Sequence, residues 1–95
     1  MNRLVVSRQA QLDLRDIADY IARDNPDRAE TFVEELLEVM ETVRVRPASF
    51  RFRDEWHSEL RSANHQGYQI IFKDREAVVE ILRIIHGARD IPNIL

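Results

Sequence analysis

The stretch that most constrains the fold of this chain is its last long apolar run, Ala77 to His86. Five of these ten residues are β-branched, a density typical of a buried strand. Strict alternation divides its apolar side chains into two sets: Val78, Leu82 and Ile84 on one face, and Val79, Ile81 and Ile85 on the other. A strand that is apolar on both faces is central in its sheet, so we expect each side to be covered.

A short strand, Arg3 to Ser7, opens the chain, and Ser7 is suited to cap the helix that follows. Apolar residues recur at intervals of three and four after it, which predicts an amphipathic helix from Arg8 to Arg23. The opposite, solvent face of this helix is expected to carry three aspartates, Asp13, Asp16 and Asp19.

The dipeptide Asn25-Pro26 separates this helix from a second one. Proline disfavours helical backbone at the residue before it and suits the first turn of a new helix. The second helix is predicted from Pro26 to Arg46, with a wider apolar stripe than the first. We therefore expect an antiparallel helical hairpin whose second helix packs on both the sheet and the first helix.

Two shorter strands are predicted before the last one, Glu59 to Ala63 and Tyr68 to Lys73. The expected fold is a single α+β domain over residues 1–95, in the order β-α-α-β-β-β, with the hairpin packed on a small antiparallel sheet. One sheet face lies away from the hairpin, and either the C-terminal tail or a partner has to cover it.

The loop from Pro47 to Ser58 interleaves aromatic residues with arginines. Phe50, Phe52 and Trp56 in such a setting indicate either a binding surface or rings folded over the sheet edge. Both interpretations stay open from the sequence.

The charge and composition of the chain argue against several classes of function. The net charge of −3 belongs entirely to residues 1–46, where seven arginines face ten acids. Seven basic residues balance seven acids in residues 47–95, so general or sequence-specific DNA binding is not expected. The chain has no cysteine, no metal or cofactor motif and no membrane-spanning run, which fits a cytoplasmic protein.

One group of residues could support chemistry. Arg61, Arg83, His86 and Arg89 include the cation and the proton carrier that a metal-free ribonuclease needs. The competing interpretation is structural: Arg83 pairs with Glu59 or another acid, and His86 ends the strand. The odd separation of Arg83 and His86 also places them on opposite faces, which favours the structural interpretation.

The order of motifs resembles the ParE-type toxins of the ParE/RelE superfamily, the toxic half of bacterial toxin–antitoxin pairs. The resemblance covers nearly the whole chain and is carried by the following segments: Asp13 to Ile17, Tyr20-Ile21, Asn25-Pro26, Ala29, Phe32, Pro47, Leu60-Arg61, Tyr68 to Ile70, Ile81 to Ile84 and His86 to Asp90. It implies the helical hairpin on a small sheet that the residues themselves predict.

The resemblance implies one of two alternative cellular targets. ParE-like members inhibit DNA gyrase and so block replication and growth, whereas RelE-like members cleave mRNA on the ribosome. The chain has no tyrosine after Tyr68 and no acid–base group in its tail, so a non-enzymatic gyrase inhibitor is favoured. A RelE-type mRNA interferase that uses Arg61, Arg83 and His86 is the alternative, and a non-toxic member that only binds an antitoxin is a second one.

The resemblance also implies a ParD-like antitoxin that folds on the toxin in a hetero-oligomer. Such a partner covers exposed apolar surface, for which the candidates are Tyr20, Phe50, Phe52, Trp56, Ile91 and Leu95. The candidates for contact with the toxin's target are Arg61, Arg83, His86, Arg89 and Trp56. No metal or cofactor is implied.

Overall fold

The computed structural model describes residues 1–95 and has the predicted element order. Its elements are β1 (Arg3–Val6), α1 (Arg8–Ala22), α2 (Pro26–Val45), a 3-10 turn (Pro47–Ser49), β2 (Arg61–His65), β3 (Tyr68–Arg75), β4 (Val78–His86) and α3 (Ile91–Ile94). The strands lie in the order β1-β4-β3-β2, with β1 parallel to β4 and the other pairs antiparallel. The predicted α+β fold is confirmed, except that the parallel pairing of β1 makes the sheet mixed rather than antiparallel throughout.

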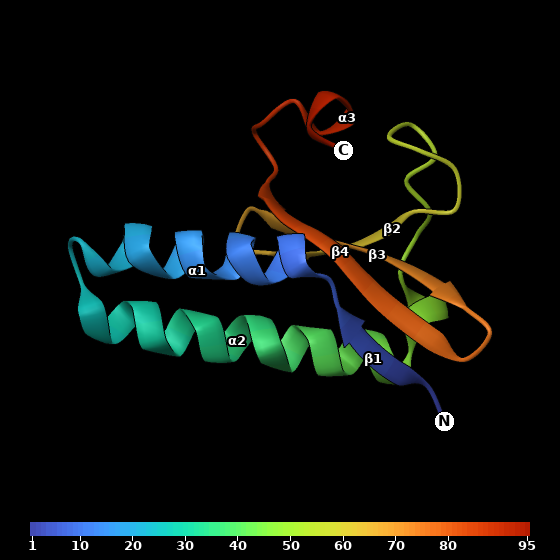
Figure 1. Ribbon diagram of the computed structural model, residues 1–95, viewed down its shortest axis with the longest axis horizontal. Coiled ribbons are helices and arrows are strands. Elements are labelled where there is room, and N and C mark those ends of the chain that lie inside the picture. Colours follow the sequence, from blue (N-terminus) through green and yellow to red (C-terminus); the bar gives the residue numbers. More distant parts are fainter.

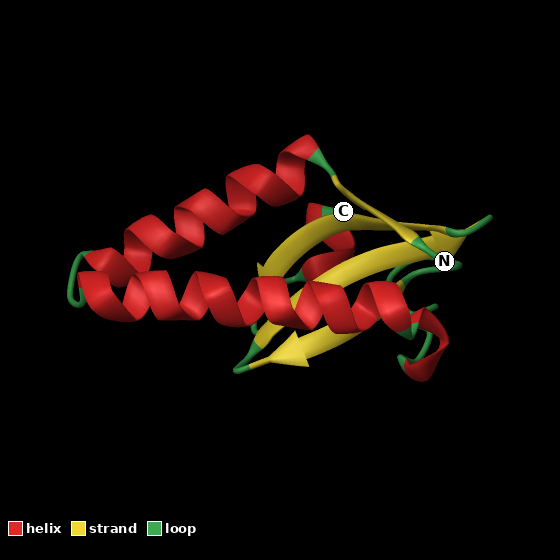
Figure 2. Cartoon of the chain, turned by 90° about the horizontal axis from the view of Figure 1, so that it is seen from below, coloured by secondary structure: helices red, strands yellow, loops and turns green.

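The two long helices begin at the caps that the sequence provides. The side chain of Ser7 accepts a hydrogen bond from the N–H of Ala10, and Asn25 accepts one from Arg28. Together α1 and α2 form an antiparallel hairpin that covers one face of the sheet, and its tip extends well beyond the strands (Figures 1 and 2). No helix is both long and apolar enough to cross a bilayer.

The main core lies between this hairpin and the sheet. It contains Phe32, Leu36 and Met40 of α2 against Phe72 of β3 and Ile81 of β4, all buried. The wide stripe predicted for the second helix therefore does contact the sheet, and it contacts α1 as well.

A second, smaller core covers the other face of the sheet. Ile91 of α3 is buried there with Leu60, Ile71 and Ile85, and Trp56 packs against the group. Figure 1 shows α3, the last segment of the chain, lying over the end of β4. The expectation that β4 is covered on both sides is confirmed, and the C-terminal tail is one of the segments that cover it.

The predicted division of β4 into two faces is wrong in its second half. A β-bulge at Leu82 breaks the register with β3, so that Ile81 pairs with Phe72 and Arg83 pairs with Ile71. One extra residue reverses the alternation after it. Ile84 therefore joins the main core, while Ile85 lies in the second core.

The boundaries of two strands also differ from the predicted ones, at the start of β2 and at the end of β3. Glu59 adopts φ +68°, so β2 begins only at Arg61 and continues to His65. β3 extends beyond its predicted end at Lys73 to Arg75, because the turn into β4 lies at Glu76-Ala77, both with positive φ. Two-residue turns of this kind match the twist of the strands that they join.

Candidate functional site

The end of β4 has a free edge on the side of α1. β1 pairs only with Val78–Ile81, and beyond that point α1 lies beside β4 without strand pairing. Ser7 donates its hydroxyl to the C=O of Leu82 at 2.9 Å, and the N–H of Ile84 donates to the carboxylate of Asp13 at 2.9 Å. Asp13 is buried, so its predicted place on the solvent face of the helix is wrong.

Arg83 is held by the same carboxylate. Its Nε and a terminal nitrogen donate to the two oxygens of Asp13 at 2.8 and 3.0 Å, and its other terminal nitrogen reaches the C=O of Ile94. The hydrogen bond to Asp13 raises the pKa of Arg83 above its ordinary value. The predicted pairing of Arg83 with an acid is confirmed, although this acid is on α1, whereas Glu59 pairs with Arg75.

A hollow of about 540 Å³ follows Asp13 along this edge. Asp16 and Tyr20 of α1 form one wall, and Tyr68, His86 and Arg89 lie on the sheet side. The ring of His86 stands edge-on to Tyr68 at 5.1 Å. Its Nδ1 accepts the N–H of Ala88, so the neutral ring carries its proton on Nε2.

Arg83 and His86 line this hollow together, despite the odd separation that predicted opposite faces. The two residues do lie on opposite faces of β4, because pairing with β3 is regular from Arg83 to His86. Arg83 reaches the hollow because its long side chain extends around the strand edge towards Asp13. Arg89 lies at the same hollow, is exposed and has no acidic partner within ion-pair distance.

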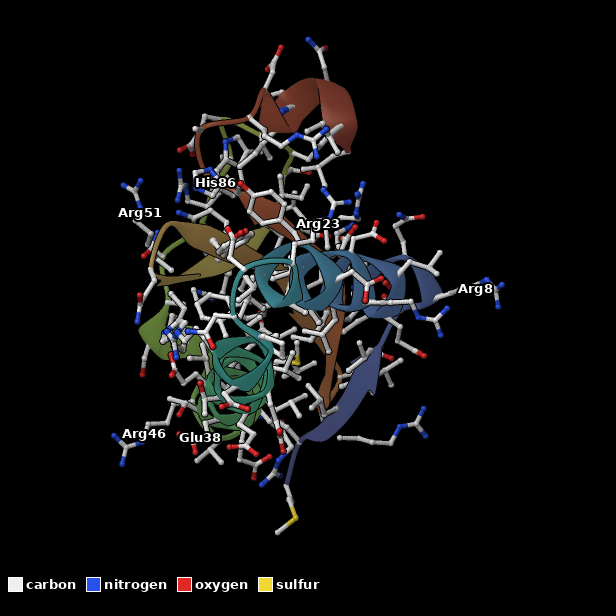
Figure 3. The ribbon with its side chains drawn as sticks, turned by 90° about the vertical axis from the view of Figure 1, so that its left-hand side faces the viewer. Arg8, Arg23, Glu38, Arg46, Arg51 and His86 are labelled. Carbon is white, nitrogen blue, oxygen red and sulfur yellow. The ribbon has the colours of Figure 1, made fainter.

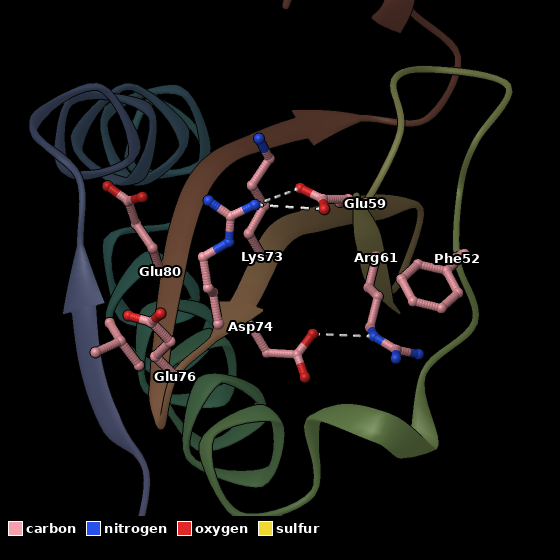
Figure 4. A pocket seen from close by; sticks show the side chains of 9 residues that line it. Phe52, Glu59, Arg61, Lys73, Asp74, Glu76 and Glu80 are labelled. Carbon is pink, nitrogen blue, oxygen red and sulfur yellow. Dashed lines mark hydrogen bonds and ion pairs between the residues drawn. The ribbon is translucent and has the colours of Figure 1, made fainter.

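Arg61 lies elsewhere, in a separate hollow of about 540 Å³ that Figure 4 shows from close by. Its Nε donates to Asp74 at 3.1 Å, a terminal nitrogen donates to the C=O of Phe50, and the guanidinium stacks on Phe52 at 3.8 Å. The structure therefore does not bring Arg61 together with Arg83 and His86, because the two groups occupy different ends of the sheet.

The predicted surface residues differ in how much they expose. Tyr20 is 66% exposed and Phe52 is 49% exposed, so both offer apolar surface. Phe50 packs edge-on against Phe72, and Trp56 lies under Arg53, so each is only half-exposed. The interpretation of this loop as rings folded on the sheet holds for Phe50 and Trp56.

The two tail candidates belong to the second core. Ile91 is 3% exposed and has no surface to offer a partner in this conformation, contrary to the prediction. Leu95 is half-buried beside it and packs against the same core. The physical reason is that the sheet face beneath them is apolar and the tail is the nearest segment that can cover it.

A third polar group, centred on Glu35, was not predicted from the sequence. Glu35 of α2 accepts hydrogen bonds from Arg28 and pairs with Nε2 of His65 at 2.7 Å, which ties α2 to the end of β2. These contacts, first that with Arg28 and then that with His65, lower the pKa of Glu35 to about 2. The contact with His65 joins segments that are distant in sequence, so no local signal predicts it.

Comparison with known proteins gives the family. The profile of a family described as the ParE toxin of the type II toxin–antitoxin system parDE matches residues 4–91. Among proteins with curated descriptions, none matches. A solved structure titled as the chromosomal ParDE system of P. aeruginosa has the same fold, with a TM-score of 0.79 at 22% identity, over 90% of this chain and 96% of that one. The chain belongs to the ParE toxin family of type II toxin–antitoxin systems.

Proposed function

We propose that this toxin acts without catalysis, by binding and inhibiting DNA gyrase, and that a ParD-like antitoxin neutralises it in the cytoplasm. The observation that carries the proposal is the separation of the residues that a nuclease would need. Arg61 is engaged by Asp74 in one hollow, whereas Arg83 and His86 line another.

The state of Arg83 supports the same conclusion. Asp13 holds its guanidinium through two hydrogen bonds and neutralises its charge, so little of it is left to stabilise a developing phosphorane. The helical hairpin also carries most of the acidic residues, and a negative surface is repelled by ribosomal RNA.

The test is supercoiling of relaxed plasmid by purified gyrase. We expect micromolar toxin to stop supercoiling and an equimolar amount of antitoxin to restore it. Relaxation of the same plasmid by a type I topoisomerase serves as the control and should be unaffected. Full supercoiling at micromolar toxin would contradict the proposal.

Cleavage of mRNA on the ribosome is the second candidate. It is favoured by one observation: Tyr68, His86 and Arg89 gather at a single hollow with two titratable rings 5.1 Å apart. If it holds, a translating extract given toxin contains cut transcripts, and His86→Ala prevents the cuts. Intact transcripts would end this candidate.

A toxin that only binds its antitoxin is the third possibility that the sequence leaves open. Expression of the chain alone distinguishes it, because an inactive toxin leaves growth unchanged. We expect growth arrest, relieved by co-expression of the antitoxin.

A further inference from the structure

We propose that the free edge of β4, between Ile84 and His86, binds an extended segment of the antitoxin that carries a carboxylate for Arg89. The inference rests on the proposed function, since it assumes that an antitoxin binds this chain. It assigns to the hollow beside α1 a role in main-chain recognition rather than in catalysis.

The backbone at this edge is arranged for strand pairing. The N–H of Gly87 donates to the C=O of Gly67 across the β3–β4 hairpin at 2.7 Å. By strand alternation the N–H of His86 therefore faces the opposite edge, as the N–H of Ile84 does towards Asp13. β1 stops at Val6 and cannot reach these groups. A segment that continues the place of β1 would pair with the N–H of His86, because Asp13 already occupies the N–H of Ile84.

The hollow has the shape and lining for such a segment. Three residues of strand span roughly 10 Å, which is compatible with a hollow of about 540 Å³. Tyr20 and Tyr68 contribute aromatic rings to its lining, and Ile84 and Ile85 contribute aliphatic side chains. A helix cannot bind in the same way, because its backbone N–H groups are already used internally and it is about 10 Å wide.

The chain itself shows that this edge accepts a carboxylate. Asp13 already bonds the N–H of Ile84 and the side chain of Arg83, which completes that part of the edge. The next cation along the hollow is Arg89, which has no acidic partner of its own. The only other unpaired charge in the lining is the carboxylate of Asp16 on α1, which repels a second carboxylate. The acid of the segment should therefore lie away from α1, on the sheet side of the hollow beside Arg89.

The test measures affinity between this toxin and the full-length antitoxin encoded beside it, by calorimetry at pH 7. Arg89→Glu and Tyr20→Ala should each weaken binding by at least about tenfold, because both residues are exposed contact groups of the segment. Arg46→Glu is the matched control, an exposed arginine far from His86 (Figure 3), and should change affinity by less than about twofold.

A second readout reports the backbone. Hydrogen exchange followed by NMR should show the amide of His86 becoming protected in the complex, while the amide of Ile84 is protected already in the free toxin by Asp13. An unprotected His86 amide in the saturated complex would overturn strand pairing at this edge.

The other outcomes separate this inference from the proposed function. Tight antitoxin binding that Arg89→Glu and Tyr20→Ala leave unchanged would overturn the inference alone. Failure of the unaltered toxin to bind antitoxin would overturn both. Variants that lose gyrase inhibition but keep antitoxin affinity would assign the hollow to the target, and a dimer of toxin alone that Arg89→Glu dissociates would assign it to a second copy.

Discussion

The carboxylate of Asp13 accepts the backbone N–H of Ile84 at 2.9 Å and so completes the edge of β4 where β1 ends. The same carboxylate binds Arg83 through both of its oxygens. One side chain of α1 thus closes a sheet edge, neutralises an arginine and fixes the first helix on the sheet.

Asp13→Asn should destabilise the fold by about 2–4 kcal/mol, because it leaves the partly buried Arg83 without a countercharge. Urea unfolding measures the change. Asp19→Asn, at an exposed position on the same helix, is the control and should lie within about 0.5 kcal/mol of the unaltered protein. Equal urea midpoints for both variants would show that the Asp13–Arg83 pair does not stabilise the fold.

Much of this architecture could be predicted from the sequence. Ser7, Asn25 and Pro26 mark the helix starts, and the β-branched run marks the central strand, because these signals are local. The burial of Asp13 also has a local signal, because it follows Ala10 by three residues and precedes Ile17 by four, which places it on the buried stripe.

The bulge at Leu82 and the separation of Arg61 from His86 could not be predicted in this way. A bulge depends on pairing with β3, and nothing in the residues of β4 alone requires one. The position of Arg61 follows from its pairing with Phe72 in the second half of β3, whereas His86 pairs with Tyr68 at the start of β3. Such features arise from tertiary contacts rather than local propensity.

Stability should fall between about pH 4.5 and pH 2 through Glu35. Its pKa is about 2 in the fold, against an ordinary value of 4.5, so the ionised form stabilises the fold. The contribution is present above pH 4.5 and is lost as the pH falls through the folded pKa. Unfolding midpoints measured from pH 6 to pH 2 should show a smaller decline in Glu35→Gln. Glu38→Gln, exposed on the same helix, should follow the unaltered protein.

Ile91→Ala should cost about 2–4 kcal/mol, because Ile91 is the buried centre of the second core and truncation leaves a cavity. Thermal unfolding followed by circular dichroism gives the shift. Pro92→Ala, at the exposed neighbouring position, provides the comparison and should have a much smaller effect. A negligible loss for Ile91→Ala would mean that the tail does not cover the sheet.

Phe52→Ala should weaken the fold by about 0.5–1 kcal/mol, since the guanidinium of Arg61 stacks on this ring at 3.8 Å. The neighbouring Arg51→Ala removes an exposed side chain whose only ion pair is long, and should have no measurable effect. Chemical denaturation of the two variants in parallel measures their free energies of unfolding. Equal values would show that the stacking of Arg61 on Phe52 does not stabilise the fold.

The most direct test of the central claim is the order in which DNA and protein synthesis stop after the toxin is induced in bacteria without antitoxin. Pulse-labelling with thymidine and with leucine measures both in the same culture. Inhibition of gyrase predicts that thymidine incorporation falls first while leucine incorporation continues. An immediate fall in leucine incorporation with thymidine incorporation maintained would contradict the account.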